Sequence, residues 1–462
     1  MPNSFLVRAP LLALLLVAAC DGPSTGVEAP PQVRTQVSTQ GAEVGTPFEF
    51  DATLGGAAFR GSGLTYTLTF APAGGGLQGA DGRISGTPAE PGLVIVTLTA
   101  TGTTGAQATQ SFPLVIFSRG LAAPQLPGAP FRYSDQGVPL PAHYLAPALG
   151  GTVVATDNTP AGNPITDAGA ALGRVLFFDR RLSANDAVSC ASCHVQAAGF
   201  SDTAQVSRGF RGEFTGRHSM SLTNARFYRN GRFFWDERAG TLEAQVLQPI
   251  QDGKEMGMTL QNLVWKLQVT PYYPALFQAA FGSAEIDSTR VARALAQYVR
   301  SLTSIDSRFD RAFAGTGDPN NFASFTPEER QGHQLFLSSG CAGCHATNAH
   351  VTDAPQNIGL DAVTTDVGAG GGRFKSPSLR NVAVRGRFMH DGRFTSLHQV
   401  VSFYDTGVQP NPDLDPGLRG ADGKPRRLNL TPAQRNALVA YLETLTDHTQ
   451  LTAQRFSDPF PR

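Results

Sequence analysis

The sequence predicts a multidomain fold, in which an N-terminal all-β sandwich is followed by two mainly α-helical domains. Three observations support this prediction. Residues 35–118 contain strand-like runs rich in β-branched and aromatic residues, separated by Gly-rich turns. From residue 161 onward, apolar residues recur at helical spacing. The pattern Cys-x-x-Cys-His occurs at residues 190–194 and again at residues 341–345, so each helical half has one copy.

The first 20 residues have the pattern of a lipoprotein signal peptide. Arg8 lies in a short N-terminal region, residues 11–17 are apolar, and two alanines precede Cys20. We expect cleavage before Cys20 and lipidation of its thiol; the alternative is an ordinary signal peptide that leaves a free cysteine. Both alternatives export the chain to the periplasm or cell envelope. Residues 21–34 would form a tether, and the N-terminal lipid would be the membrane attachment, because no later apolar run is long enough to span a bilayer.

Residues 35–118 are predicted to form the β-sandwich. The runs at 64–70 and 94–100 are typical of strands, and Ala80-Asp81-Gly82 indicates a turn. The segment from Gly82 to Pro88, with the strand that follows it, resembles the Ig-like domains attached to many exported bacterial proteins. Because residues 35–118 contain neither histidine nor cysteine, we expect a spacer or docking role rather than catalysis.

A proline-rich linker is expected at residues 119–160, and helical domains at 161–318 and 319–462. Helices are predicted from Thr166 to Phe178 and from Ser288 to Leu302 by their apolar spacing. Two further helices should begin at the Thr-Pro pairs 326–327 and 431–432, because both resemble capping boxes. The segment from Gly173 to the first Cys-x-x-Cys-His motif is similar to the segment from Gly332 to the second, which indicates an internal repeat.

The two Cys-x-x-Cys-His motifs are the attachment signature of c-type haem. Two thiols at this spacing can reach both vinyl groups of one porphyrin, and the adjacent imidazole then lies under the iron. A redox dithiol or half of a zinc site would leave both histidines unexplained. We therefore expect two covalent haem c groups, held by Cys190, Cys193 and His194 and by Cys341, Cys344 and His345.

Composition excludes some functions. The 462 residues include 37 basic and 37 acidic ones, so the charge gives no support for nucleic-acid binding. Of the five cysteines, four would be bound to haem and Cys20 to lipid, so none is left to form a disulfide. Each domain must therefore be held by its own core or by its cofactor.

Several longer motifs of the helical half are similar to one known family. From about residue 161 to the C-terminus, the chain resembles the diheme cytochrome c peroxidase superfamily, which includes the MauG enzymes. Besides the haem motifs, the residues that carry this resemblance are Leu176–Asp179, Phe234–Arg238, Leu242–Ile250, Glu255-Met256, Phe374–Asn381 and Met389–Phe394.

The resemblance implies roles for individual residues. Trp235 matches the tryptophan that relays electrons between the two haems. Glu255 matches the carboxylate in the distal pocket of the first haem, which moves a proton between the peroxide oxygens. Gln245 and Pro249 match its neighbours. The haem of residues 161–318 would then be peroxidatic, and the haem of residues 319–462 would transfer electrons. Without the resemblance, Trp235 would be expected in the core and Glu255 in solvent.

The sixth ligand of the second haem distinguishes the peroxidases from the MauG enzymes. Alignment with the family places Tyr404 at the position that is methionine in the peroxidases, which is the MauG-like choice. A phenolate lowers the potential of the iron, whereas a thioether raises it. Met389 is the rival ligand and His390 a weaker one.

Two departures from the family leave details open. The removable distal histidine of some peroxidases falls near Phe210, so we expect the first haem to be open from the start. The asparagine that helps to bind calcium in the family is replaced by His218, so one calcium ion stays an open expectation. His218 could approach the first iron or be a satisfied structural histidine.

The resemblance implies an exported enzyme that uses hydrogen peroxide and oxidises a protein partner through Trp235 and the second haem. That partner would be a small cytochrome c or cupredoxin, or a protein with oxidisable aromatic side chains; Tyr404 favours the second. The alternative is a non-catalytic diheme electron carrier, which would need strong sixth ligands on both irons. A sensor whose β-sandwich recognises a partner is a third possibility.

Overall fold

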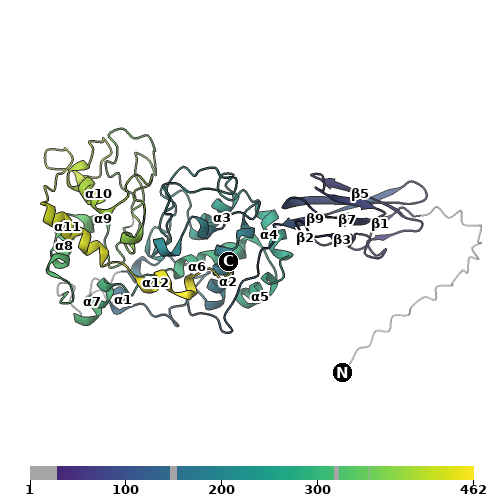
Figure 1. Cartoon of the computed structure of the whole chain (residues 1–462), viewed down its shortest axis with the longest axis horizontal. Helices are drawn as coiled ribbons and strands as arrows, with labels where there is room; N and C mark the ends of the chain where they lie inside the picture. The colour runs from purple at the N-terminus through teal and green to yellow at the C-terminus, as the bar shows by residue number, and fades with distance from the viewer. Residues whose placement is uncertain (1–28, 146–152, 317–321, 353, 462) are drawn as a thin grey trace, which may run out of the picture.

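The computed structural model describes residues 29–145, 153–316, 322–352 and 354–461. The expected signal peptide, Cys20 and most of the tether lie outside the described residues. Along the long axis of the molecule, the β-domain lies at one end and the two helical units follow it (Figure 1). No helix among the described residues is long and apolar enough to cross a membrane.

The β-domain is a sandwich of a four-stranded sheet, in the order β2-β9-β8-β5, and a three-stranded sheet, in the order β3-β7-β6. All neighbouring pairs are antiparallel except β2 and β9, which run parallel. Side chains that alternate inward along β8, such as Val96 and Leu98, are fully buried between the sheets. The strands are β1 (Gln32–Val33), β2 (Gln40–Glu43), β3 (Phe48–Asp51), β4 (Phe59–Arg60), β5 (Thr65–Ala71), β6 (Leu77–Ala80), β7 (Arg83–Gly86), β8 (Gly92–Thr101) and β9 (Gln107–Phe117).

The predicted strands and the turn after Ala80 are present, as β5, β8 and the β6–β7 hairpin. Asp81 and Gly82 both have positive φ, 48° and 76°, as this tight hairpin requires. The β-domain begins earlier than the expected residue 35, because Gln32 and Val33 pair with Arg60 and Phe59.

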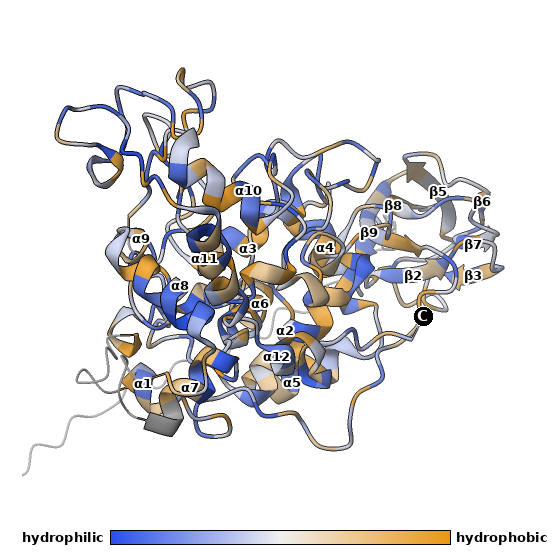
Figure 2. Cartoon of the chain, turned by 60° about the vertical axis from the view of Figure 1, so that its left-hand side comes forward, coloured by the Kyte–Doolittle hydropathy of each residue, from blue (hydrophilic) through white to orange (hydrophobic). Residues whose placement is uncertain are grey.

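The helices are α1 (Ala142–Leu145), α2 (Asp167–Phe178), α3 (Leu242–Gln251), α4 (Leu260–Gln268), α5 (Tyr273–Phe281), α6 (Ser288–Ser301), α7 (Arg308–Thr316), α8 (Pro327–Ser338), α9 (Cys341–Cys344), α10 (Leu397–Ser402), α11 (Pro432–Glu443) and α12 (His448–Thr452). The caps follow the sequence: Thr166 accepts a hydrogen bond from Gly169 N, and Thr326 and Thr431 form complete capping boxes. Hydrophobic and hydrophilic residues alternate around the helices, as expected when one face is buried (Figure 2).

The internal repeat has a structural basis in two helix crossings. A Cβ atom on Gly173 would lie 2.0 Å from Ala294 O, and one on Gly332 would lie 1.9 Å from Ala437 O. Gly173 therefore lets α2 contact α6, and Gly332 lets α8 contact α11 in the same way. Tyr298 and Tyr441, four residues beyond the contacted carbonyls, are buried at equivalent positions.

Two segments pack against the helical unit on the other side of the expected boundary at residue 318. Helix α7, expected with the first unit, contributes Phe309 and Phe313 to the core of the second. The tail of the chain returns to the first unit, where Phe456 joins the core. The expected linker is also packed, since Tyr144 is fully buried and donates to Ser304 O. These contacts join residues far apart in the chain, so the local pattern could not indicate them.

Candidate functional site

Two adjacent cavities in the helical part each contain one Cys-x-x-Cys-His motif. The His194 cavity has a volume of about 370 Å³ and is lined by Cys190, Cys193 and His194. The His345 cavity has a volume of about 410 Å³ and is lined by Cys341, Cys344 and His345. The predicted attachment residues therefore come together in two separate groups.

The residues of both cavities fit covalent haem. The four thiols are free, as thioether formation requires. His194 Nδ1 lies 3.0 Å from Phe200 O, and donation to this carbonyl leaves Nε2 with a lone pair for iron. Burial lowers the pKa of His345 to about 4 and also lowers the pKa of His194, so both imidazoles are neutral, as iron ligation requires.

One wall of the His194 cavity is formed by α3 and the turn that follows it. Gln245 and Pro249 on α3 line this cavity together with Glu255. Burial, and then the charge of Asp252, raise the pKa of Glu255 to about 7, while Arg238 opposes this shift. A carboxyl group with this pKa can both accept and donate a proton at neutral pH.

The internal repeat extends to the helices α3 and α10, which line the two cavities. Thr241 caps α3 and Ser396 caps α10 with the same side-chain hydrogen bond. Eight residues after its cap, the first copy has Pro249 and the second has Tyr404, and each lines its own cavity. A proline side chain has no ligand atom, whereas a phenol oxygen can bind iron. The two cavities therefore differ in coordinating ability at one equivalent position.

The phenol of Tyr404 is suited to face a metal. The side chain lines the His345 cavity, and its hydroxyl has no hydrogen bond among the described residues. Burial raises the pKa of Tyr404 above its usual value. A ferric iron would reverse this shift, because metal coordination favours the ionised ligand.

The rival ligands line the same cavity. His390 stacks on Phe374 with a centroid distance of 3.6 Å, and its Nε2 is 3.9 Å from Asp366. Met389 occupies the hairpin position that corresponds to Phe234, and these two residues have φ of 70° and 69°.

The wall between the two cavities contains Trp235. The residues that line both cavities are His218, Met220, Ser221, Trp235, Lys375 and Pro377. The indole of Trp235 donates to His218 O at 2.7 Å, and its ring lies 6.5 Å from that of His390. Trp235, the residue predicted to relay electrons, thus lines both cavities, as does the imidazole of His218.

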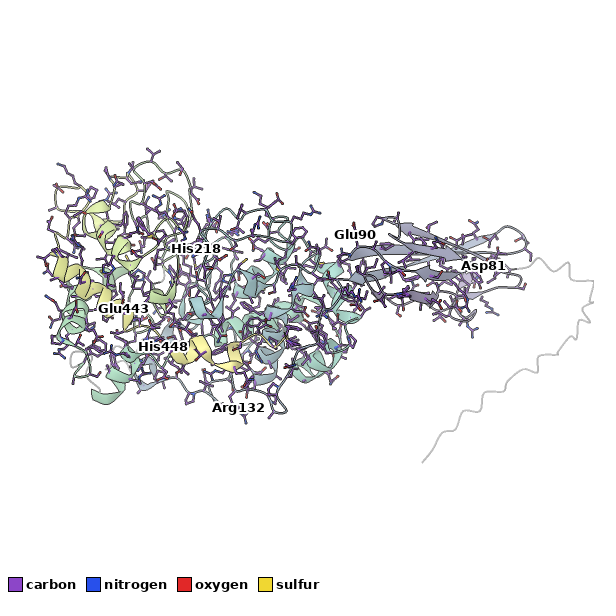
Figure 3. The ribbon with its side chains drawn as sticks, in the orientation of Figure 1. Asp81, Glu90, Arg132, His218, Glu443 and His448 are labelled. Carbon is purple, nitrogen blue, oxygen red and sulfur yellow. The ribbon has the colours of Figure 1, made fainter. Side chains whose placement is uncertain are left out.

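His218 lies at the junction of the two helical units (Figure 3). It is buried, with Nε2 3.1 Å from Ser201 Oγ and Nδ1 3.2 Å from Ala204 O and Gln205 O. Partners on both ring nitrogens favour the structural alternative over iron ligation. Among the described residues, no group of three or more His, Cys, Asp or Glu side chains could hold a metal ion, so the expected calcium has no such cluster.

Sequence reasoning missed two charged residues of this region. Lys375 is buried between the cavities, with Nζ 3.6 Å from the centre of the Tyr228 ring, and burial lowers its pKa to about 7. Arg217 pairs with both Asp236 and Asp366 at 2.7 Å beside the His194 cavity. Lys375 lies within the family motif Phe374–Asn381, but the motif gives its side chain no role, and Arg217 lies in no motif. In both cases the partners come from distant parts of the chain.

Comparisons with known proteins identify the family of the chain. The family model described as di-haem cytochrome c peroxidase matches residues 167–318, a cytochrome c model matches residues 329–446, and an Ig-domain model matches residues 30–117. MauG of Methylorubrum extorquens is 37% identical over 62% of this chain and 80% of its own length. Cytochrome-c peroxidase IdrP1 of Denitromonas iodatirespirans is 30% identical over 62% of this chain and 84% of its own length.

Solved structures give the same result. A MauG-like protein associated with microbial copper homeostasis is 30% identical, with a TM-score of 0.57 over 66% of this chain and 96% of that protein. The diheme peroxidase BthA from Burkholderia thailandensis is 25% identical, with a TM-score of 0.53 over 64% of this chain and 91% of that protein. The chain therefore belongs to the MauG and di-haem cytochrome c peroxidase family, and it is a haem c peroxidase with an added N-terminal Ig-like domain.

Proposed function

We propose that this protein reduces hydrogen peroxide in the His194 cavity and oxidises a protein partner by electron transfer through Trp235 and the His345 cavity. When bound, haem c supplies an iron that can accept a peroxide oxygen and exchange single electrons. The observation that carries the proposal is the difference between Pro249 and Tyr404 at equivalent positions, because Tyr404 offers a ligand atom in the second cavity and Pro249 offers none in the first.

The proton chemistry of peroxide reduction falls to Glu255. Its carboxylate can take a proton from one peroxide oxygen and return it to the other, and a pKa of about 7 suits both steps. Gln245 lines the same cavity and can orient peroxide with its amide, which has both donor and acceptor atoms.

Trp235 is suited to carry electrons without losing its proton. Its indole N–H donates to a backbone carbonyl, which is not a base at neutral pH, so the proton stays on the ring when an electron leaves. Because electrons cross the protein through this ring, the partner does not need to enter a deep substrate pocket.

The partner would be a protein with oxidisable aromatic side chains, as the MauG-like Tyr404 favours, or a small cytochrome c or cupredoxin. We propose that the enzyme works in the periplasm, attached to a membrane by lipid on Cys20. Mass spectrometry of the mature N-terminus would check the lipid.

Adding one equivalent of hydrogen peroxide to the ferric diheme protein tests the proposal. We expect peroxide to be consumed while the Soret and near-infrared bands change. Low-temperature paramagnetic resonance, recorded before and after addition of cyanide to the resting protein, should show one iron that binds cyanide and one that does not. If peroxide leaves the spectra unchanged and neither iron binds cyanide, the protein is the non-catalytic electron carrier instead.

A further inference from the structure

We infer that the Ig-like domain is a structural part of the peroxide pocket, because the end of its last strand anchors the loop that holds the Glu255 segment. This inference rests on the proposed role of Glu255. It adds to the spacer or docking role that the sequence predicts for this domain.

The anchor begins at Ser118, directly after β9. Its backbone N–H donates to Asp186 Oδ2 at 2.7 Å, and its hydroxyl donates to Asn185 O at 3.2 Å. Asp186 is 1% exposed and its other carboxylate oxygen forms an ion pair with buried Lys266 of α4. A buried carboxylate that accepts from the Ig-like domain on one side and from α4 on the other joins the two units tightly.

Further contacts prevent the Ig-like domain from rotating about this anchor. The guanidinium of Arg181 lies 6.0 Å from the Phe117 ring and donates to Leu121 O at 2.6 Å. A Cβ atom added to Gly41 of β2 would lie 3.4 Å from Val269, at the end of α4, so the two surfaces lie close together there.

The loop from Ser183 to Ala187 connects this anchor to the segment that contains Glu255. Ala184 N donates to Met256 O at 2.8 Å. The side-chain amide of Asn185 donates to Phe210 O at 2.9 Å, and Phe210 N in turn donates to Glu255 O at 2.8 Å. The carbonyl groups of Glu255 and Met256 are thus tied to the loop that Ser118 holds, Met256 directly and Glu255 through Phe210.

The packing at Glu255 leaves little room for adjustment. A Cβ atom on Gly209 would lie 1.5 Å from Lys254 O, and one on Gly257 would lie 2.3 Å from the Phe210 ring. Because residues 209–210 and 254–257 interlock, a shift of the loop must move the Glu255 backbone or open a gap that admits water. Hydration would lower the pKa of Glu255 toward its ordinary value of 4.5.

Two variants of the full diheme protein test the inference. Ser118→Pro removes the N–H that is donated to Asp186, whereas the control Ser118→Ala keeps this N–H and removes only the hydroxyl. A second variant with two glycines inserted between Phe117 and Ser118 frees the Ig-like domain and leaves Ser118 itself intact. Hydrogen exchange of backbone amides, followed by mass spectrometry, reports on each loop separately.

We expect the amides of Ala184 and Phe210 to exchange about tenfold faster or more in Ser118→Pro and in the insertion variant, and near the wild-type rate in Ser118→Ala. Exchange in α11 should stay unchanged in all of them, which excludes global unfolding. Unchanged exchange at Ala184 and Phe210 in both decoupled variants would overturn the inference.

The pH profile of peroxide reduction gives a second readout. Its acidic limb should move to lower pH in the decoupled variants. The charged groups that act on Glu255 are Asp252 and Arg238, and neither is altered. The sulfurs of Cys190 and Cys193 also lie near Glu255, but as haem thioethers they carry no charge. If Glu255 has no role in catalysis, the pH profile will not move but the exchange rates still will, so the two failures can be told apart.

Discussion

At the scale of single residues, Glu255 is the side chain whose replacement is expected to affect peroxide reduction most. To take a proton from peroxide it must be ionised, and burial together with Asp252 places its pKa at about 7. Peroxide reduction should therefore fall as the pH drops below about 7 and reach a plateau above it. Replacing Glu255 with Gln should lower kcat/KM by roughly 10²–10⁴-fold and abolish this pH dependence.

Steady-state kinetics between pH 5 and 9 would measure both effects of Glu255→Gln. The matched control is Glu328→Gln, at an exposed position on α8, which should leave the profile unchanged. A Glu255→Gln enzyme with wild-type kcat/KM would remove Glu255 from the proton transfer.

Tyr404 is the second residue whose replacement has a defined outcome. Tyr404→Met should raise the reduction potential of the second haem, because a thioether favours ferrous iron. Tyr404→Phe should leave this iron without a sixth ligand and therefore high-spin. Potentiometry and paramagnetic resonance would check these outcomes. Met389→Leu is the control, since it should change neither property unless Met389 is the ligand.

At the scale of secondary-structure elements, the two close helix crossings should limit stability. An added methyl group at Gly173 would lie 2.0 Å from a carbonyl oxygen of α6, so the helices would have to separate. Gly173→Ala should lower the free energy of unfolding by about 1–3 kcal/mol. Thermal unfolding of the haem-loaded protein would measure this loss. Gly162→Ala, where a Cβ atom has no neighbour within 4 Å, should be close to neutral.

Local elements could be predicted well, because their signals are local. The caps at Thr166, Thr326 and Thr431 each depend on side chains within three residues, and the sequence shows them directly. The sequence could not predict that α7 packs against the second helical unit and the C-terminal tail against the first. This packing depends on which apolar face of each unit is left uncovered once the units have folded. The Ser118–Asp186 hydrogen bond links residues 68 positions apart through a backbone N–H, which leaves no pattern in the sequence.

At the scale of the whole molecule, a repeated unit gives rise to two unequal centres. Both copies have a Cys-x-x-Cys-His motif, a close glycine crossing and a capped distal helix, but Pro249 in the first corresponds to Tyr404 in the second. The haem motifs were visible in the sequence, whereas the correspondence of Pro249 and Tyr404 required the two cap positions. Trp235 lies in the wall that the two cavities share.

The position of Trp235 between the two cavities leads to a prediction for the molecule as a whole. The chain has two tryptophans, Trp235 in the shared wall and Trp265 on α4, so each can serve as the other's control. Trp235→Phe keeps an aromatic ring of similar shape but is much harder to oxidise. It should leave the first reaction with peroxide intact and slow the oxidation of a protein partner by at least about tenfold, whereas Trp265→Phe should affect neither.

Stopped-flow spectroscopy would separate the two steps, because peroxide consumption and partner oxidation are followed at different wavelengths. A loss of peroxide consumption in Trp235→Phe would mean that the indole shapes the pocket, since its N–H also holds the backbone at His218. Equal partner oxidation in both variants would mean that electrons reach the partner from the first cavity directly. Only a defect confined to the second step, and to Trp235, fits two centres that act in series.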